Sequence, residues 1–254
     1  MTESLLVEWA NDGVLTLTLN RPERRNALNP ELLTGLTTAL LTEGARASAV
    51  IVRGAGGAFS SGYDISRLTG SVEDLEADRF IGDAANALRT CPAPVIAQLD
   101  RHCHGAAVEI ALSCDLRIAA DNLRMSVPAV SLGVVYRYQF VARLVQICGV
   151  ARASDLLLAM PELDAERAYS WGLLTEVVTA GGVEARVVEL ARMLAASPPA
   201  AVRGTKASLN LLGARAASSD DLERAQELRT RAAGSPERRE AVRRRQQSIS
   251  RRAR

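Results

Sequence analysis

The sequence predicts an α/β fold in which a core of strands and helices precedes a helical C-terminal region. Over the first half of the chain, short apolar runs of strand length alternate with longer segments that have helical spacing. From about residue 137 onward, the pattern is almost wholly helical. A chain of 254 residues can bury a substantial core without disulfides. We expect the core over residues 1–195 and the helical region over residues 196–254.

The N-terminal segment is expected to open with a β-hairpin and continue into a helix. Residues 5–9 and 14–19 are apolar runs that flank Asn11-Asp12-Gly13, and Asp-Gly between two such runs is a hairpin signal. Asn29 can cap a following helix with Pro30 at its first position. Leucines then recur at helical spacing.

Alternating elements follow up to about residue 120. The pattern predicts a strand at residues 49–52, a helix at 72–88, a strand at 95–99, a short helix at 106–113 and a strand at 116–119. This alternation indicates βα units with right-handed crossovers. In the C-terminal part, Asp164 is expected to cap a helix that Gly172 ends, and further helices start near residues 183, 198, 220 and 235.

Charge and composition exclude several classes of function. The formal net charge is +2, so no overall field favours nucleic acid, and the basic last helix lacks aromatic stacking residues. The N-terminus has no basic and apolar leader, and no apolar run approaches the roughly 18 residues of a membrane span. The four cysteines are widely spaced and are expected to be free thiols. We therefore expect a cytoplasmic protein.

A glycine-rich loop follows the strand at residues 49–52, but its spacing does not match a phosphate-binding motif. It contains no lysine for a Walker loop. After Gly54 and Gly56, the third glycine position of a dinucleotide fingerprint is Phe59. The nucleophile-elbow pattern GxSxG does not occur around Ser60 or Ser61. These glycines must serve another ligand or another geometry.

A second loop, at residues 100–106, ends where a short helix begins. Small residues at this corner allow a ligand to approach the backbone, and the first N–H groups of a helix have no partner within it. Glu109 lies three residues beyond Ala106, so it shares a face with these N–H groups. A carboxylate beside an oxyanion site suits enolate formation. The spacing fits equally a carboxylate that only interacts with the helix dipole.

These segments together resemble the crotonase, or enoyl-CoA hydratase/isomerase, superfamily. The resemblance covers nearly the whole chain. It is carried by these segments in this order: NRPERRNALNPEL, GAGGAFSSGYDI, PVIAQLDRHCHGAAVEIALSCDLRIAA, VSLGV and AERAYSWGLLTEVV. It implies a crotonase-like spiral of ββα units with a helical C-terminal trimerisation region. It also implies an acyl-CoA substrate, no further cofactor, no metal, and a homotrimer or a dimer of trimers.

The resemblance assigns roles to particular residues. The backbone N–H groups of Tyr63 and Ala106, which follow Gly62 and Gly105, would polarise the thioester carbonyl. Glu109 matches one acid/base glutamate of the hydratases. The residues expected along the path of coenzyme A are Arg24, Ala27, Asp64, Ile65 and Ser66. Asp64 is alternatively a residue that only makes hydrogen bonds within its loop.

One part of the hydratase pattern is missing. The second glutamate of the pair falls on Ala129, and a methyl group cannot relay a proton. The segment VSLGVVY is similar to VNLGVPY of methylmalonyl-CoA decarboxylase, whose active-site tyrosine matches Tyr136. A decarboxylase is therefore one alternative, although the nearby threonine of that enzyme falls on Pro128. A non-catalytic acyl-CoA-binding protein is another.

Tyr136 and the two histidines, His102 and His104, also have structural interpretations. Tyr136 could equally pack in the core or a loop. The histidines could ligate a metal, but no third ligand stands at a recognisable spacing, so structural or cavity-lining roles are favoured.

Overall fold

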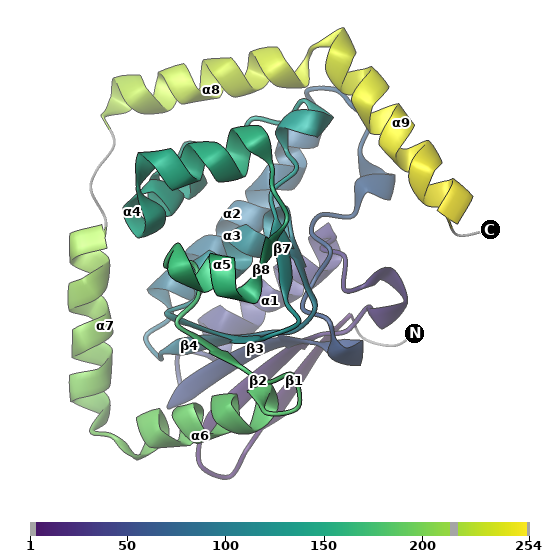
Figure 1. Cartoon of the computed structure of the whole chain (residues 1–254). Helices are drawn as coiled ribbons and strands as arrows, with labels where there is room; N and C mark the ends of the chain where they lie inside the picture. The colour runs from purple at the N-terminus through teal and green to yellow at the C-terminus, as the bar shows by residue number, and fades with distance from the viewer. Residues whose placement is uncertain (1–3, 214–217, 253–254) are drawn as a thin grey trace.

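Figure 1 shows the computed structural model, which describes residues 4–213 and 218–252. Its centre is a six-stranded sheet with the order β1-β2-β3-β4-β6-β9. β1 pairs antiparallel with β2, and all other neighbours in this sheet are parallel. The strands are β1 (Leu5–Trp9), β2 (Val14–Leu19), β3 (Ala49–Gly54), β4 (Val95–Leu99), β6 (Leu116–Ala120) and β9 (Glu176–Val178). The α/β prediction is confirmed.

A smaller sheet stands beside the main one, in the order β5-β7-β8. Its strands are β5 (His102–His104), β7 (Arg124–Ser126) and β8 (Leu163–Asp164). Because side chains alternate along a strand, its two faces differ in chemistry. Cys103, Met125 and Leu163 are fully buried in the core. His102, His104 and Ser126 line a cavity on the other side.

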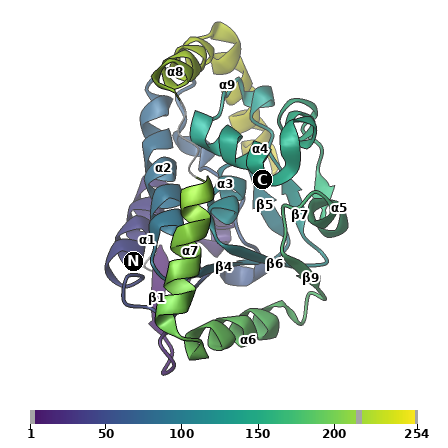
Figure 2. The same cartoon turned by 90° about the vertical axis from the view of Figure 1, so that its left-hand side faces the viewer.

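Helices cover both faces of the main sheet. α1 (Pro30–Thr42), α2 (Asp74–Thr90) and α3 (Ala106–Ser113) lie on one side, and α6 (Val183–Ala196) lies on the other (Figure 2). The side chains of the strands alternate between these two sides of the sheet. Leu15 and Val50 belong to the larger core, whereas Val14 and Ile51 pack with Val187 of α6. Asn29 caps α1 as expected, because its side chain accepts a hydrogen bond from Leu32 N at 2.9 Å.

The C-terminal half is less uniformly helical than the sequence predicts. The strands β8 and β9 interrupt it, which corrects the prediction that everything after residue 137 is almost wholly helical. Both strands are three residues or shorter, so neither carries a readable alternation of side chains. Asp164 caps the following helix as expected, accepting from Arg167 N at 2.8 Å. The remaining helices are α4 (Tyr138–Ser154), α5 (Ala165–Ser170), α7 (Pro199–Gly213), α8 (Ser219–Ala233) and α9 (Pro236–Arg252).

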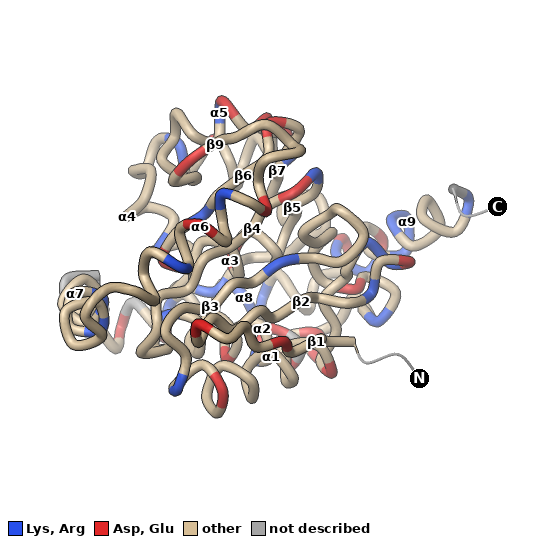
Figure 3. The backbone as a smooth tube through the Cα atoms, turned by 90° about the horizontal axis from the view of Figure 1, so that it is seen from below, with Lys and Arg blue, Asp and Glu red and all other residues tan. Residues whose placement is uncertain are grey.

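The helices α8 and α9 extend along one end of the molecule, away from the main sheet (Figure 1). Blue positions for Lys and Arg recur along α9 in Figure 3, and the sequence shows that those of residues 236–252 are arginines. Gln246 of α9 donates 3.0 Å hydrogen bonds to the carbonyls of Ile65 and Leu68, so this helix is attached to the loop after the glycine-rich segment. Within the described residues, every helix is too short or too polar to cross a membrane. The four cysteines are free thiols, as expected.

Candidate active site

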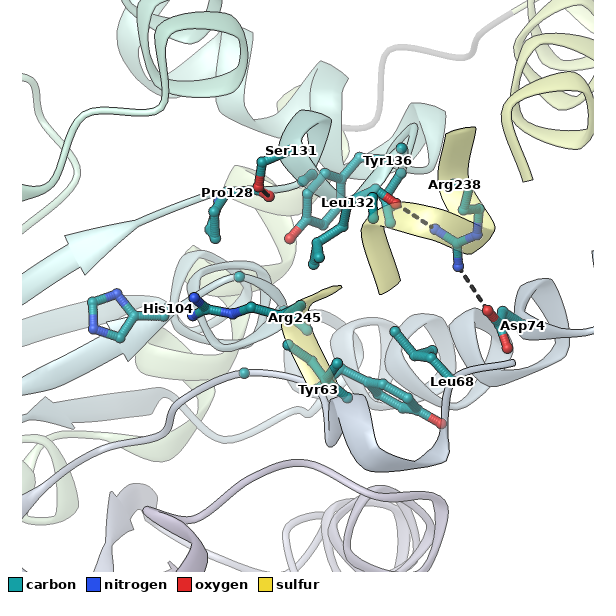
Figure 4. A pocket seen from close by; sticks show the side chains of 18 of the residues that line it. Tyr63, Leu68, Asp74, His104, Pro128, Ser131, Leu132, Tyr136, Arg238 and Arg245 are labelled. Carbon is teal, nitrogen blue, oxygen red and sulfur yellow. Dashed lines mark hydrogen bonds and ion pairs between the residues drawn. The ribbon is translucent and has the colours of Figure 1, made fainter. Parts of the chain in front are cut away.

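A cavity of about 770 Å³ lies between the small sheet, α2 and the C-terminal helices α8 and α9. Its wall combines Gly62, Tyr63, Gly105 and Ala106 with side chains from α2, from residues 126–136, and from α8 and α9. Figure 4 shows Tyr63 and Tyr136 on opposite sides of this space. The two loops that the sequence singled out therefore reach one cavity.

A short bridge aligns the two loops. Ser60 and Cys103 form a parallel β-bridge. Ser60 N donates to His102 O at 2.9 Å, and His104 N donates to Ser60 O at 3.2 Å. Because both chains run in the same direction from this bridge, residues 62–63 come to lie beside residues 104–106.

Gly62 allows the close approach that follows. Its φ is +91°, and a Cβ at this position would lie 2.5 Å from His104 O and 3.5 Å from Ala106 N. A side chain here would therefore collide with the backbone of the second loop, in a conformation that L-residues avoid. This glycine brings two backbone segments together beside a cavity.

The amide of Tyr63 points away from its neighbouring segment. Leu28 N donates to Gly62 O at 2.8 Å, and Asp64 N donates to Leu28 O at 2.9 Å. In such a parallel bridge, the residue between the two bonded positions directs its own N–H to the opposite side. The N–H of Tyr63 is thus left available for another acceptor.

The amide of Ala106 is the first N–H of α3. Gly105 precedes it with φ +56° and ψ −122°, a conformation that suits glycine, and its own N–H donates to Ser126 O at 2.8 Å. This bond fixes the turn against β7. The N–H groups of a first helical turn have no acceptor within the helix, so Ala106 N can serve a ligand in the cavity.

Glu109 is positioned differently from the two amides. It is 3% exposed, and it is absent from the described residues that line the cavity. Arg137, just before α4, donates a hydrogen bond to its Oε1. Burial raises the pKa of Glu109 to about 7, and the charge of Asp78 adds to this, while Arg137 and Arg89 oppose it. The carboxyl group therefore changes charge near neutral pH.

Tyr136 lines the cavity beside the turn at Gly105. Its hydroxyl lies 3.8 Å from the point that a Cβ on Gly105 would occupy. Its ring packs on Phe140 with a centroid separation of 4.6 Å. Burial raises the pKa of the phenol, and the charges of Glu109 and Asp78 raise it further. The hydroxyl thus remains protonated and can donate a hydrogen bond. Ala129 lines the same wall and brings only a methyl group.

Comparisons with known proteins identify the family of this chain. Residues 9–250 match the sequence model of the family described as enoyl-CoA hydratase/isomerase. The chain belongs to this family. A probable enoyl-CoA hydratase from Mycobacterium tuberculosis is 33% identical over 204 residues, covering 80% of this chain and 81% of that protein.

Solved structures of enoyl-CoA hydratase/isomerase proteins have the same fold. One from Xanthobacter autotrophicus superposes with a TM-score of 0.85 at 33% identity, covering 96% of this chain and 94% of that one. Methylmalonyl-CoA decarboxylase in complex with 2-nitronate-propionyl-CoA superposes with a TM-score of 0.87 at 27% identity, covering 95% of each chain. The predicted family and the crotonase-like fold are thus confirmed.

The residues expected along the coenzyme A path do not all line the cavity. Ile65 lines the cavity, whereas Arg24 is exposed and the neighbouring Arg25 lines the cavity instead. Ala27 is buried. Burial alone would raise the pKa of Asp64, but hydrogen bonds from Ser66 and Arg21 hold it below its usual value. Asp64 and Ser66 thus stabilise their own loop, with Ser66 Oγ donating to Asp64 Oδ1 at 2.6 Å.

The histidines lie at the end of the cavity formed by the small sheet. His104 Nδ1 and Ser126 Oγ are 2.9 Å apart. Figure 4 shows Arg245 of α9 extending toward His104. Burial lowers the pKa of both His102 and His104, and each histidine lies near further cationic groups. Within the described residues, no three His, Cys, Asp or Glu side chains are grouped as a metal site would require.

The sequence interpretation missed two ion pairs in the cavity wall. Asp74 pairs with Arg238 at 2.9 Å, and Asp78 pairs with Arg229. Both aspartates belong to α2 and both arginines to the C-terminal helices α8 and α9. The sequence does contain a signal for these two aspartates. Asp74 and Asp78 stand at helical spacing before Ile81, so they lie on the same face of α2 as this apolar residue.

Proposed function

We propose that this protein processes acyl-CoA thioesters through an enolate, held by the backbone N–H groups of Tyr63 and Ala106. The observation that carries the proposal is the approach of Gly62 to residues 104–106 beside one cavity. Two donors that converge on one carbonyl oxygen stabilise the charge that develops there when a proton leaves C2. The coenzyme A thioester is the substrate, and this proton transfer requires no further cofactor.

Glu109 is proposed to act as an acid/base group of this reaction, as the family resemblance implies. Its raised pKa suits proton transfer near neutral pH. However, Glu109 is 3% exposed and is absent from the described residues that line the cavity, so its surroundings must shift before the carboxylate can reach a substrate. Arg24, Ala27, Asp64, Ile65 and Ser66 are proposed to shape the path of coenzyme A, with Ile65 in the cavity wall.

Exchange of substrate hydrogen for deuterium tests this function directly. Hexanoyl-CoA is incubated with the enzyme in deuterated water, and incorporation at C2 is followed by mass spectrometry. The enolate mechanism predicts incorporation that depends on enzyme concentration. Binding of hexanoyl-CoA in calorimetry without incorporation would instead identify a non-catalytic acyl-CoA-binding protein. A lack of both binding and incorporation would contradict the proposal as a whole.

A decarboxylase is the second candidate, and Tyr136 favours it. Its protonated hydroxyl is located beside the turn at Gly105, and the fold superposes closely on methylmalonyl-CoA decarboxylase. Loss of carbon dioxide from a malonyl-type thioester generates the same enolate without paired glutamates. Methylmalonyl-CoA is the probe, and released carbon dioxide is measured. Release that is lost in Tyr136→Phe would support this candidate, and no release by the wild type would exclude it.

The assembly is proposed to be a homotrimer or a dimer of trimers, by analogy with the family alone. Light scattering coupled to size-exclusion chromatography measures the mass of the assembly. A mass of three or six chains agrees with the proposal, and the mass of a single chain contradicts it.

A further inference from the structure

We propose that Asp78 is a further catalytic residue of this enzyme, a carboxylate that exchanges a proton with the acyl chain in the cavity. This assignment rests on the proposed enolate function and adds a second proton-transfer group to Glu109. It answers the problem raised by Ala129, which leaves the hydratase pair incomplete, and by Glu109, whose carboxylate lies outside the described cavity lining. Asp78 lines the cavity from α2, whereas Ala129 lines it from the segment after β7.

Asp74 and Asp78 are neighbours on one helical face, but their bonding differs. Asp74 accepts hydrogen bonds on both oxygens, from Thr69 N, Thr69 Oγ1, Gly70 N and Arg238 Nη2. Its side chain is 4% exposed, and its oxygens are used in holding both the turn at Thr69 and Gly70 and the helix α9. Asp74 is therefore a structural carboxylate even though it touches the cavity.

Asp78 retains a free oxygen. Arg229 binds its Oδ2, and no described residue donates a hydrogen bond to Oδ1. The side chain is 26% exposed, and the exposed part lines the cavity. A carboxylate held by one oxygen and open at the other is positioned as a general base requires.

The surroundings of Asp78 include the other groups that the reaction needs. The amide of Tyr63 is one proposed oxyanion donor. Burial raises the pKa of the Tyr63 and Tyr136 phenols, and the nearby charge of Asp78 raises both further. Burial raises the pKa of Asp78 itself, whereas Arg229, Arg137 and Arg238 lower it. Glu109 also lies within electrostatic range. The charge of Asp78 is thus set by residues from α3, α8, α9 and the segment before α4.

The proposed step conserves atoms and charge. Oδ1 of Asp78 takes a proton from C2 of the acyl group, the C–H bond breaks, and its electron pair moves to the thioester oxygen. That oxygen accepts hydrogen bonds from Tyr63 N and Ala106 N. With a 3-enoyl thioester, return of the same proton to C4 moves the double bond into conjugation and regenerates the carboxylate. No oxidant, reductant or second substrate is required.

The test uses Asp78→Asn, which preserves the shape of the side chain and an acceptor for Arg229. The matched control is Asp83→Asn, at an exposed position of the same helix. Deuterium incorporation into hexanoyl-CoA, conversion of trans-3-hexenoyl-CoA to its conjugated isomer, and calorimetric binding of hexanoyl-CoA are measured for each. Asp78→Asn is expected to slow incorporation and isomerisation by about 10² to 10⁴-fold while binding is retained. Asp83→Asn should behave as the wild type.

The outcomes separate this assignment from the proposed function. Incorporation by Asp78→Asn at the wild-type rate would overturn the role of Asp78 alone. Absence of incorporation by the wild type would overturn the enolate function and the assignment with it. A second variant, Arg229→Met, keeps the test usable if Asp78→Asn does not fold. Without its cationic partner, Asp78 should lose its proton only at higher pH. The rising limb of the pH–rate profile should therefore move to higher pH. An unshifted limb in a folded variant would contradict the assignment.

Discussion

Arg137 donates a hydrogen bond to the carboxylate of Glu109, and both side chains are largely withdrawn from solvent. The pair joins α3 to the residue that precedes α4. Gly82 of α2 provides the space, because a Cβ there would lie 2.2 Å from Nη1 of Arg137. The helices α2 and α3 and the residue before α4 are thus arranged around one ion pair next to the cavity. In this pair, the charge of Arg137 compensates that of Glu109, which the family resemblance identifies as an acid/base residue.

Removal of Arg137 should leave a buried charge without its partner. Arg137→Met is expected to lower the free energy of unfolding at pH 7 by about 3 kcal/mol, the low end of the range for a broken buried pair, since Glu109 can take up a proton. The double variant with Glu109→Gln should recover most of this loss. Urea denaturation of the four proteins measures the coupling. Additive effects of the two substitutions would contradict the energetic role of the pair.

The pH dependence of stability should report the raised pKa of Glu109. Its value of about 7 in the folded protein exceeds the ordinary value of 4.5. Between these values the folded state binds more protons than the unfolded state, so the free energy of unfolding falls as pH rises. Glu109→Gln removes this contribution. The wild type should therefore lose more stability than the variant between pH 5 and pH 8 in denaturant titrations, and equal losses would contradict a raised pKa.

Gly62→Ala should damage the site more than an equivalent change at Gly57. Both glycines have positive φ, so each substitution carries a backbone cost of roughly 1–2 kcal/mol. At Gly57 the new methyl group meets no atom within 4 Å, whereas at Gly62 it meets His104 O at 2.5 Å. Displacement of the two amides should slow deuterium incorporation by about 10²-fold in Gly62→Ala only. Equal rates in the two variants would show that the close approach is unimportant.

The ion pair between Arg238 and Asp74 should hold α9 over the cavity. Figure 4 shows Arg238 between Asp74 and the carbonyl of Leu132. Arg238→Met leaves Asp74 buried without its cation, so we expect faster hydrogen exchange throughout α9 and weaker binding of hexanoyl-CoA. Arg243→Met, at an exposed position of the same helix, is the control. Unchanged exchange of α9 in Arg238→Met would contradict the anchoring role.

The larger part of the fold could be predicted from local signals. The hairpin, the Asn29 cap and the helix at residues 106–113 each follow from a few neighbouring residues and agree with the structure. The strands β5 and β7 were not predicted. Each has only three residues, and each forms because a distant segment supplies its partner. Such pairing leaves no periodic pattern in the sequence.

The candidate site could be predicted only in part. The small residues at the start of the helix at residues 106–113 suggest a backbone ligand site, whereas the role of the first loop followed only from the family resemblance. Residues of both loops line the cavity. The pairing of Glu109 with Arg137 joins residues 28 positions apart through a space left by Gly82, so no local pattern reports it. The role of α8 and α9 in the wall of the cavity depends equally on contacts between distant residues. Asp78 could have been predicted from the sequence, because it is a carboxylate on the buried face of an amphipathic helix.

The convergence of two amides on one carbonyl oxygen is the central claim, and the vibration of that carbonyl tests it most directly. Hexanoyl-CoA labelled with ¹³C at C1 is bound to the wild type and to Gly62→Ala, and the carbonyl band is isolated by infrared difference spectroscopy. We predict that the band moves to lower wavenumber on binding to the wild type, because both N–H groups polarise the bond, and that Gly62→Ala loses this shift. A bound thioester whose band stays at its position in water would contradict the account.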